Sequence, residues 1–149
     1  MPSGRRQRVS VITLAVANVA QAREFYHAWG WVPHSDGGDI VFYQANGLVI
    51  GLYESAAFAA DQGREGATLG VGGVALAQNY PTEPQVDERF RAAVAAGATI
   101  LKPPTRAEWG GYSGYIADLD GHVWELAVNP FWDLSEDGSV TMPDDAVGA

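Results

Sequence analysis

The chain carries an internal repeat, which limits the folds available to it. The segment NGLVIGLY at 46–53 aligns with DGHVWELA at 120–127, turn on turn and strand on strand. Each segment starts with a dipeptide that tolerates the positive φ angles of a tight hairpin turn and continues as a strand. The alignment places Gly51 over Glu125. Such a repeat is typical of a duplicated supersecondary unit, so we expect two copies of one small fold.

Each copy shows the order strand, helix and three strands. In the first copy, a β-branched run at 9–17 predicts a strand, and Asn18 is a typical N-cap for the helix that follows. Short strands separated by turn sequences then continue to Glu54. In the second copy, Thr82 begins the predicted helix and Gly97 ends it.

These elements divide the chain into four segments. We expect a first module at 8–54, a linker at 55–67, a second module at 68–130 and an acidic tail at 131–149. The tail is polar and has no sustained periodicity, so we expect its last residues to be poorly ordered.

Composition narrows the range of partners. The formal net charge of −9 disfavours nucleic acid and anionic membranes and is more compatible with a neutral or cationic small ligand. The chain has no cysteine, which excludes thiolate metal sites and thiol nucleophiles. Arg5 and Arg6 precede a short, interrupted apolar run that we interpret as mature protein rather than a signal peptide. We therefore expect a cytoplasmic protein with no membrane partner.

Two segments carry a resemblance to a known family. VITLAVANVAQAREFYHAWGW near the start and YIADLDGHVWELAVNP near the end resemble the vicinal oxygen chelate superfamily, which includes glyoxalase I, extradiol dioxygenases, fosfomycin-resistance proteins and bleomycin-resistance proteins. Leu119 stands where the family usually has a proline. The resemblance implies an α+β fold of two tandem βαβββ modules that form a curled mixed sheet around a cleft, with the helices outside. It also implies a homodimer.

Most of the metal ligands of this family are missing from this sequence. Metal-dependent members place one ligand on the first strand and one on the last strand of each module, and these places correspond to Val11, Gly51, Gly73 and Glu125. Only Glu125 retains a donor side chain, and a single carboxylate does not hold a divalent cation. We therefore expect no metal and no other cofactor.

None of the histidines replaces a missing ligand in our interpretation. His27 is expected on the surface of the first helix and His34 near a loop, while His122 shares strand parity with Trp124 and should point away from the cleft.

Glu125 admits two interpretations. It is either a remnant of the ancestral site, satisfied by an arginine, a tyrosine hydroxyl or water, or a cleft residue that anchors a ligand. If the protein is an enzyme, Glu125 is the candidate general base, with its pKa raised by apolar surroundings. No other residue is a catalytic candidate.

Strand parity predicts which side chains share a cleft with Glu125. Trp124 and Leu126 should face the core, with Trp29 and Phe90, while Glu125 faces the other way. The inward positions are mostly small or apolar, and aromatic walls are expected from Phe42 or Tyr43 and from the segment EWGGYSGY, which contains Trp109, Tyr112 and Tyr115. The ligand-binding candidates are Glu125, Tyr53, Thr13, Trp109, Tyr112 and Phe42.

Two classes of function remain open. The first is a metal-independent binding protein of the glyoxalase/bleomycin-resistance type that holds a cationic or aromatic organic ligand in an apolar cleft. The second is a lyase, isomerase or dioxygenase-like enzyme that uses Glu125 or a metal site that the sequence does not reveal. The missing metal ligands favour the metal-independent binding protein.

Overall fold

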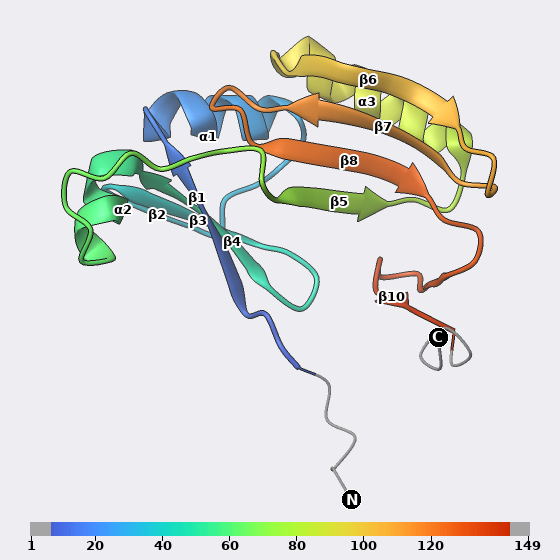
Figure 1. The fold of residues 1–149 in the computed structure, drawn as a ribbon, viewed down its shortest axis with the longest axis horizontal. Helices are drawn as coiled ribbons and strands as arrows, with labels where there is room; N and C mark the ends of the chain where they lie inside the picture. The colour runs from blue at the N-terminus through green and yellow to red at the C-terminus, as the bar shows by residue number, and fades with distance from the viewer. Residues whose placement is uncertain (1–6, 144–149) are drawn as a thin grey trace, which may run out of the picture.

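A computed structural model describes residues 7–143. In chain order the elements are β1 (Val11–Val16), α1 (Val19–Ala28), β2 (Ser35–Gly37), β3 (Ile40–Gln44), β4 (Val49–Glu54), α2 (Ser55–Asp61), β5 (Ala75–Asn79), α3 (Glu83–Ala96), β6 (Thr99–Arg106), β7 (Tyr112–Ala117), β8 (Val123–Val128), β9 (Asp133–Leu134) and β10 (Val140–Thr141). Figure 1 shows this path. Arg5 and Arg6 and the end of the predicted tail lie outside the described residues.

The two modules have the same sheet topology. The first sheet has the strand order β1-β4-β3-β2 and the second has β5-β8-β7-β6. In each sheet the first and last strands of the module pair in parallel, and the remaining pairs are antiparallel. The predicted α+β fold of two βαβββ modules is therefore confirmed. Among the described residues, no helix is long and apolar enough to cross a membrane.

Local capping chemistry sets the helix boundaries. The Asn18 side chain accepts a hydrogen bond from the Gln21 amide at 2.9 Å, which satisfies one of the free N–H groups at the start of α1. Thr82 caps α3 in the same way, and Gly97 ends that helix with φ of 119°, a conformation that favours glycine.

Three segments differ from the sequence-based expectation. The predicted linker contains α2, because the Glu54 carboxylate accepts hydrogen bonds from the Ala56 and Ala57 amides and caps the helix. The strand expected from Leu69 begins only at Ala75, after a glycine-rich coil. The tail contains the small β9–β10 hairpin.

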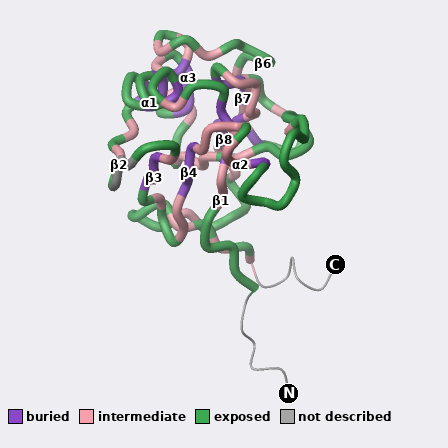
Figure 2. The backbone as a smooth tube through the Cα atoms, turned by 90° about the vertical axis from the view of Figure 1, so that its left-hand side faces the viewer, coloured by how far each residue is buried: buried purple, intermediate pink, exposed green. Residues whose placement is uncertain are grey.

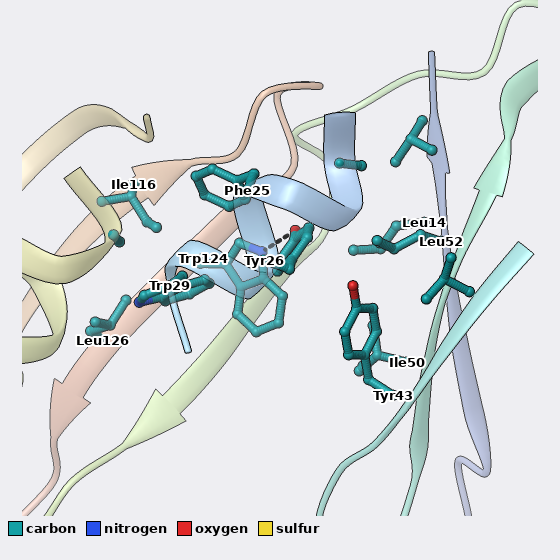
Figure 3. Packing of buried hydrophobic residues seen from close by; sticks show 14 of the residues in the cluster. Leu14, Phe25, Tyr26, Trp29, Tyr43, Ile50, Leu52, Ile116, Trp124 and Leu126 are labelled. Carbon is teal, nitrogen blue, oxygen red and sulfur yellow. Dashed lines mark hydrogen bonds between the residues drawn. The ribbon is translucent and has the colours of Figure 1, made fainter. Parts of the chain in front are cut away.

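α1 lies between the two sheets, and α3 packs on the side of the second sheet that faces α1. The Trp31 ring lies 5.6 Å from the ring of Tyr43 on β3 and 5.5 Å from that of Trp124 on β8. In a flat sheet in which β1 neighboured β5, β3 and β8 would be roughly 19 Å apart. The two sheets therefore converge on their helix-bearing sides, and Figure 3 shows α1 between their strands.

This arrangement differs from the expected curled sheet with the helices outside, because the strands form two separate sheets and α1 packs between them. Within one chain α1 and α3 pack on the sides of the sheets that face each other, so the opposite faces of the two sheets point away from each other. α2 lies next to β1 and β4, where Phe58 stacks on Tyr53. Figure 2 shows that β3 and β4 contain buried residues, whereas most residues of β6 are exposed.

A buried carboxylate joins the modules. Asp118, only 4% exposed, accepts hydrogen bonds from the Tyr26 hydroxyl at 2.5 Å and from the backbone amides of Asp120 and His122, each at 2.9 Å. The Tyr26 oxygen in turn accepts a hydrogen bond from the Trp124 indole at 3.1 Å. The carboxylate, the hydroxyl and the indole N–H thus all have hydrogen-bond partners in the core.

The turn before β8 also contacts β1. The Ala17 amide donates to the Asp120 carboxylate at 2.8 Å, and a ring nitrogen of His122 lies 2.6 Å from the Ala15 carbonyl oxygen. These contacts fix the second module against the first.

We predict that Tyr26→Phe lowers the free energy of unfolding by about 1–3 kcal/mol, because a buried carboxylate and an indole N–H each lose a partner. Urea unfolding measures the change. Tyr53→Phe is the control, since Tyr53 stacks on Phe58 at a partly exposed position; its effect should stay within about 0.5 kcal/mol. Equal losses in the two variants would contradict this role of Asp118.

Candidate functional site

Glu125 lies on the helix-free face of β8. Its neighbours Trp124 and Leu126 are 3% and 0% exposed and belong to the core, whereas Glu125 is partly exposed on the opposite face. The predicted alternation of core-facing and outward-facing side chains along this strand is confirmed.

Sheet register places Glu125 in a row of side chains. Ala77 on β5 lies opposite Glu125, Tyr115 on β7 lies opposite it on the other side, and Lys102 on β6 lies opposite Tyr115. Residues directly opposite in neighbouring strands share a face. The row thus combines a carboxylate, a phenol and an ammonium group.

Tyr115 is coupled to Glu125. Burial raises the pKa of Tyr115, and the negative charge of Glu125 and a hydrogen bond to that carboxylate raise it further. A tyrosine hydroxyl as the partner of Glu125 was one of the alternatives raised by the sequence. Lys102 was not predicted, because a register shift beside it breaks the alternation of β6.

The surroundings of this row are small and apolar. Ala75 and Ala77 are exposed on β5, and Val123 and Ala127 flank Glu125 on its own face of β8. The carboxylate is therefore the main polar feature at the middle of an apolar surface.

On the corresponding face of the first module, the ring of Phe42 covers Gly51, the position that matches Glu125. A methyl group added at Gly51 would lie 3.3 Å from the Phe42 ring and 3.6 Å from the Thr13 hydroxyl oxygen. Thr13, Gly51 and Phe42 are direct neighbours across β1, β4 and β3. Beside the Phe42 ring lies a hollow of about 320 Å³, which Val11 and Val49 also line.

The residues present do not fit a divalent metal. Of the four family positions, Val11, Gly51 and Gly73 lack donor atoms, and the Phe42 ring covers the direction in which a side chain at Gly51 would point. Within residues 7–143 no three His, Cys, Asp or Glu side chains group closely enough to hold a metal ion.

Phe42 and Thr13 come together as predicted, but Tyr112 does not join Glu125. The Tyr112 hydroxyl donates a hydrogen bond to Asp87 of α3 at 2.5 Å, so this side chain lies on the helix side of β7. That hydrogen bond raises the pKa of Tyr112 to about 12. Tyr43, the alternative to Phe42, is 1% exposed and also belongs to the core.

The remaining aromatic candidates lie apart from the row. Tyr53 stacks on Phe58 of α2 with 5.2 Å between ring centroids. Trp109 is 57% exposed, covers the backbone of Gly111 and lies 6.3 Å from the ring of Phe131. These contacts make Trp109 part of an exposed aromatic corner at the β6–β7 turn.

Two of the histidines are exposed and the third bridges the modules. His27 and His34 are exposed, and His34 borders the hollow beside Phe42. His122 contacts the Ala15 carbonyl, so it faces β1 rather than Glu125.

Comparisons with known proteins give the family. The model of the Glyoxalase/Bleomycin resistance protein/Dioxygenase superfamily matches residues 8–126, and the chain belongs to this superfamily. No curated protein matches the chain.

Solved structures agree with this assignment. A glyoxalase-related enzyme from Fulvimarina pelagi is 39% identical, with a TM-score of 0.86 over 92% of this chain and 99% of that one. A lactoylglutathione lyase from Agrobacterium tumefaciens is 20% identical, with a TM-score of 0.67 over 88% of this chain and 100% of that one. A family enzyme from Burkholderia phytofirmans is also 20% identical, with a TM-score of 0.70 over 80% and 96%. The last two show the fold alone.

We predict that Glu125→Gln lowers the pKa of Tyr115 toward the ordinary value for tyrosine, because the carboxylate charge no longer opposes tyrosinate formation. A spectrophotometric titration of tyrosinate absorbance, compared with the same titration of Tyr115→Phe, isolates this residue. If the Tyr115 step stays at the same pH in Glu125→Gln, the two side chains are not coupled.

Proposed function

We propose that this protein is a metal-independent binding protein that holds an organic molecule against an apolar surface through Glu125. The observation that carries the proposal is the Glu125–Tyr115 pair, which is placed at the centre of a face made of alanine and valine. A buried or half-buried carboxylate requires a partner, and the Tyr115 hydroxyl supplies only one hydrogen bond. The second carboxylate oxygen is then available to a ligand.

The proposed ligand is cationic or aromatic. A carboxylate favours a positive group, and the Phe42 ring of the first module offers an aromatic face of the kind that stabilises cations. The net charge of −9 adds a long-range attraction for cations. Lys102 at the end of the row would orient a ligand by repelling its positive group toward Glu125.

We further propose that the cleft is completed by a second copy of the chain. In one chain the Phe42 face and the Glu125 face point away from each other, so neither is opposed by the other module. A homodimer would bring the Phe42 face of one chain against the Glu125 face of its partner. Such a pairing would cover exposed apolar side chains on the two faces, among them Val11, which is 50% exposed, and Ala77.

The cellular location belongs to the same proposal. We propose that the protein binds its ligand in the cytoplasm, as expected from the sequence.

An enzymatic role is the second candidate. The similar protein from Fulvimarina pelagi is described as a glyoxalase-related enzyme, and the one from Agrobacterium tumefaciens as a lactoylglutathione lyase. In this case Glu125 would accept a proton from a bound substrate, and Tyr115 would hold the carboxylate in position. Elemental analysis of untagged protein separates the metal-dependent form of this candidate, because stoichiometric Fe, Mn, Ni or Zn would contradict metal-independent binding.

We predict that Glu125→Gln weakens ligand binding about tenfold, because an interfacial charge pair loses one charge. Benzyltrimethylammonium, a cation with an aromatic ring, serves as the first probe, and a thermal-shift screen of cationic and aromatic metabolites extends the search. Calorimetry measures the affinities.

Glu108→Gln is the matched control, since Glu108 is an exposed carboxylate in the β6–β7 turn. Equal affinities of the Glu125 variant and the native protein for every ligand found would remove Glu125 from the site.

A further inference from the structure

A second cavity, partly open to solvent, lies on the helix-bearing side of the sheets. α1 fills only part of the space between the two sheets, and a cavity of about 490 Å³ remains beside it. Ile12 and Ile50 form its wall on the first sheet, and Leu76 and Trp124 form its wall on the second. This volume suits a small organic molecule.

The C-terminal hairpin covers this cavity. Gly138 and Val140 contribute to its lining. The Asn46 amide, in the β3–β4 turn, donates hydrogen bonds to the Asp137 carbonyl at 2.7 Å and to the Ser139 hydroxyl at 3.0 Å. In Figure 1 this turn extends below β5 toward β10. The hairpin is thus attached to the first module although it follows the second module in sequence.

The lining is aromatic and uncharged. Trp31, Trp124 and Tyr80 contribute rings, and the lining includes no Asp, Glu, Lys, Arg or His. The Tyr80 hydroxyl donates to the Gln78 side-chain oxygen at 2.8 Å, so the Gln78 amide nitrogen remains as a donor. Arg89 interacts with the Tyr80 hydroxyl but is not part of the lining. A charged molecule would therefore lose its hydration here without a counter-ion in the lining itself.

We propose that this cavity binds a neutral, ring-containing organic molecule and that the β9–β10 hairpin closes over it. The rings stack on the ligand, and the Gln78 amide donates a hydrogen bond to a carbonyl or hydroxyl oxygen. Trp124 lines this cavity and Glu125 points to the other side of β8, so the two sites meet only at the edge strand β5, where Ala75 and Ala77 border both.

A matched pair of fluorescent probes tests the chemistry. N-phenylnaphthylamine is neutral, and anilinonaphthalene sulfonate has a similar ring system with a negative charge. We expect saturable binding of the neutral probe to the full chain, with one probe per chain, and binding of the sulfonate about tenfold weaker or more. Equal or tighter binding of the sulfonate would overturn the assignment.

Variants of the hairpin and its attachment test the location. Val140→Trp should weaken binding of the neutral probe about tenfold, because the larger ring occupies the cavity. Leu119→Trp, at an exposed position outside the cavity, is the control and should leave the affinity unchanged. Asn46→Ala should raise the dissociation rate about threefold or more, because the hairpin loses two hydrogen bonds. The proposal is overturned if Val140→Trp binds the neutral probe as tightly as the native protein does.

Discussion

The packing of aromatic rings between the sheets determines the rest of the structure. The Tyr26 ring lies 6.1 Å from Tyr43 on one sheet and 6.1 Å from Trp124 on the other, and Trp31 makes a similar pair of contacts. Burial of such rings is among the largest favourable contributions available to a domain of this size. Because the rings hold both sheets by their inner sides, the outer sides stay free for binding. The hydrogen bonds of Asp118 then fix the angle between the modules in a way that apolar packing alone would not.

Much of the fold follows from the sequence, because the repeat, the turn dipeptides and the alternation of apolar residues all concern local geometry. Strand parity correctly assigned Trp124 to the core and Glu125 to the other face. Strand alternation does not determine whether the helix-bearing face of a sheet faces the other module or points away from it. Both arrangements bury the same residues of each module. That choice depends on long-range contacts such as the one between Tyr26 and Asp118, which are 92 positions apart.

The neighbours of Glu125 were predicted less completely, because they depend on the register in which the strands pair. Tyr112 and Tyr115 are three residues apart on one strand, so they face opposite sides, and only the pairing of β7 with β8 shows that Tyr115 is the neighbour of Glu125. The register shift next to Lys102 hid the third member of the row. Phe42 lies beside Thr13 and Gly51, and its ring fills the space that a side chain at Gly51 would enter.

The two proposed sites use the same sheets in different ways. The outer face offers a carboxylate and a cation-stabilising ring, whereas the inner cavity offers rings and amides without charge. One chain thus presents different chemistry on the two sides of one strand. In the proposed dimer, ligand specificity on the outer face would depend on which surface of the partner chain opposes it.

The pairing of outer faces between two chains can be measured directly, because the native chain has no cysteine and any introduced thiol is unique. Val11→Cys marks the Phe42 face and Ala77→Cys marks the Glu125 face, and both positions are exposed in one chain. A mixture of the two single variants, treated with a short bismaleimide, should give a covalent dimer that neither variant forms alone. A mixture that stays monomeric under denaturing electrophoresis would contradict a cleft shared between two copies.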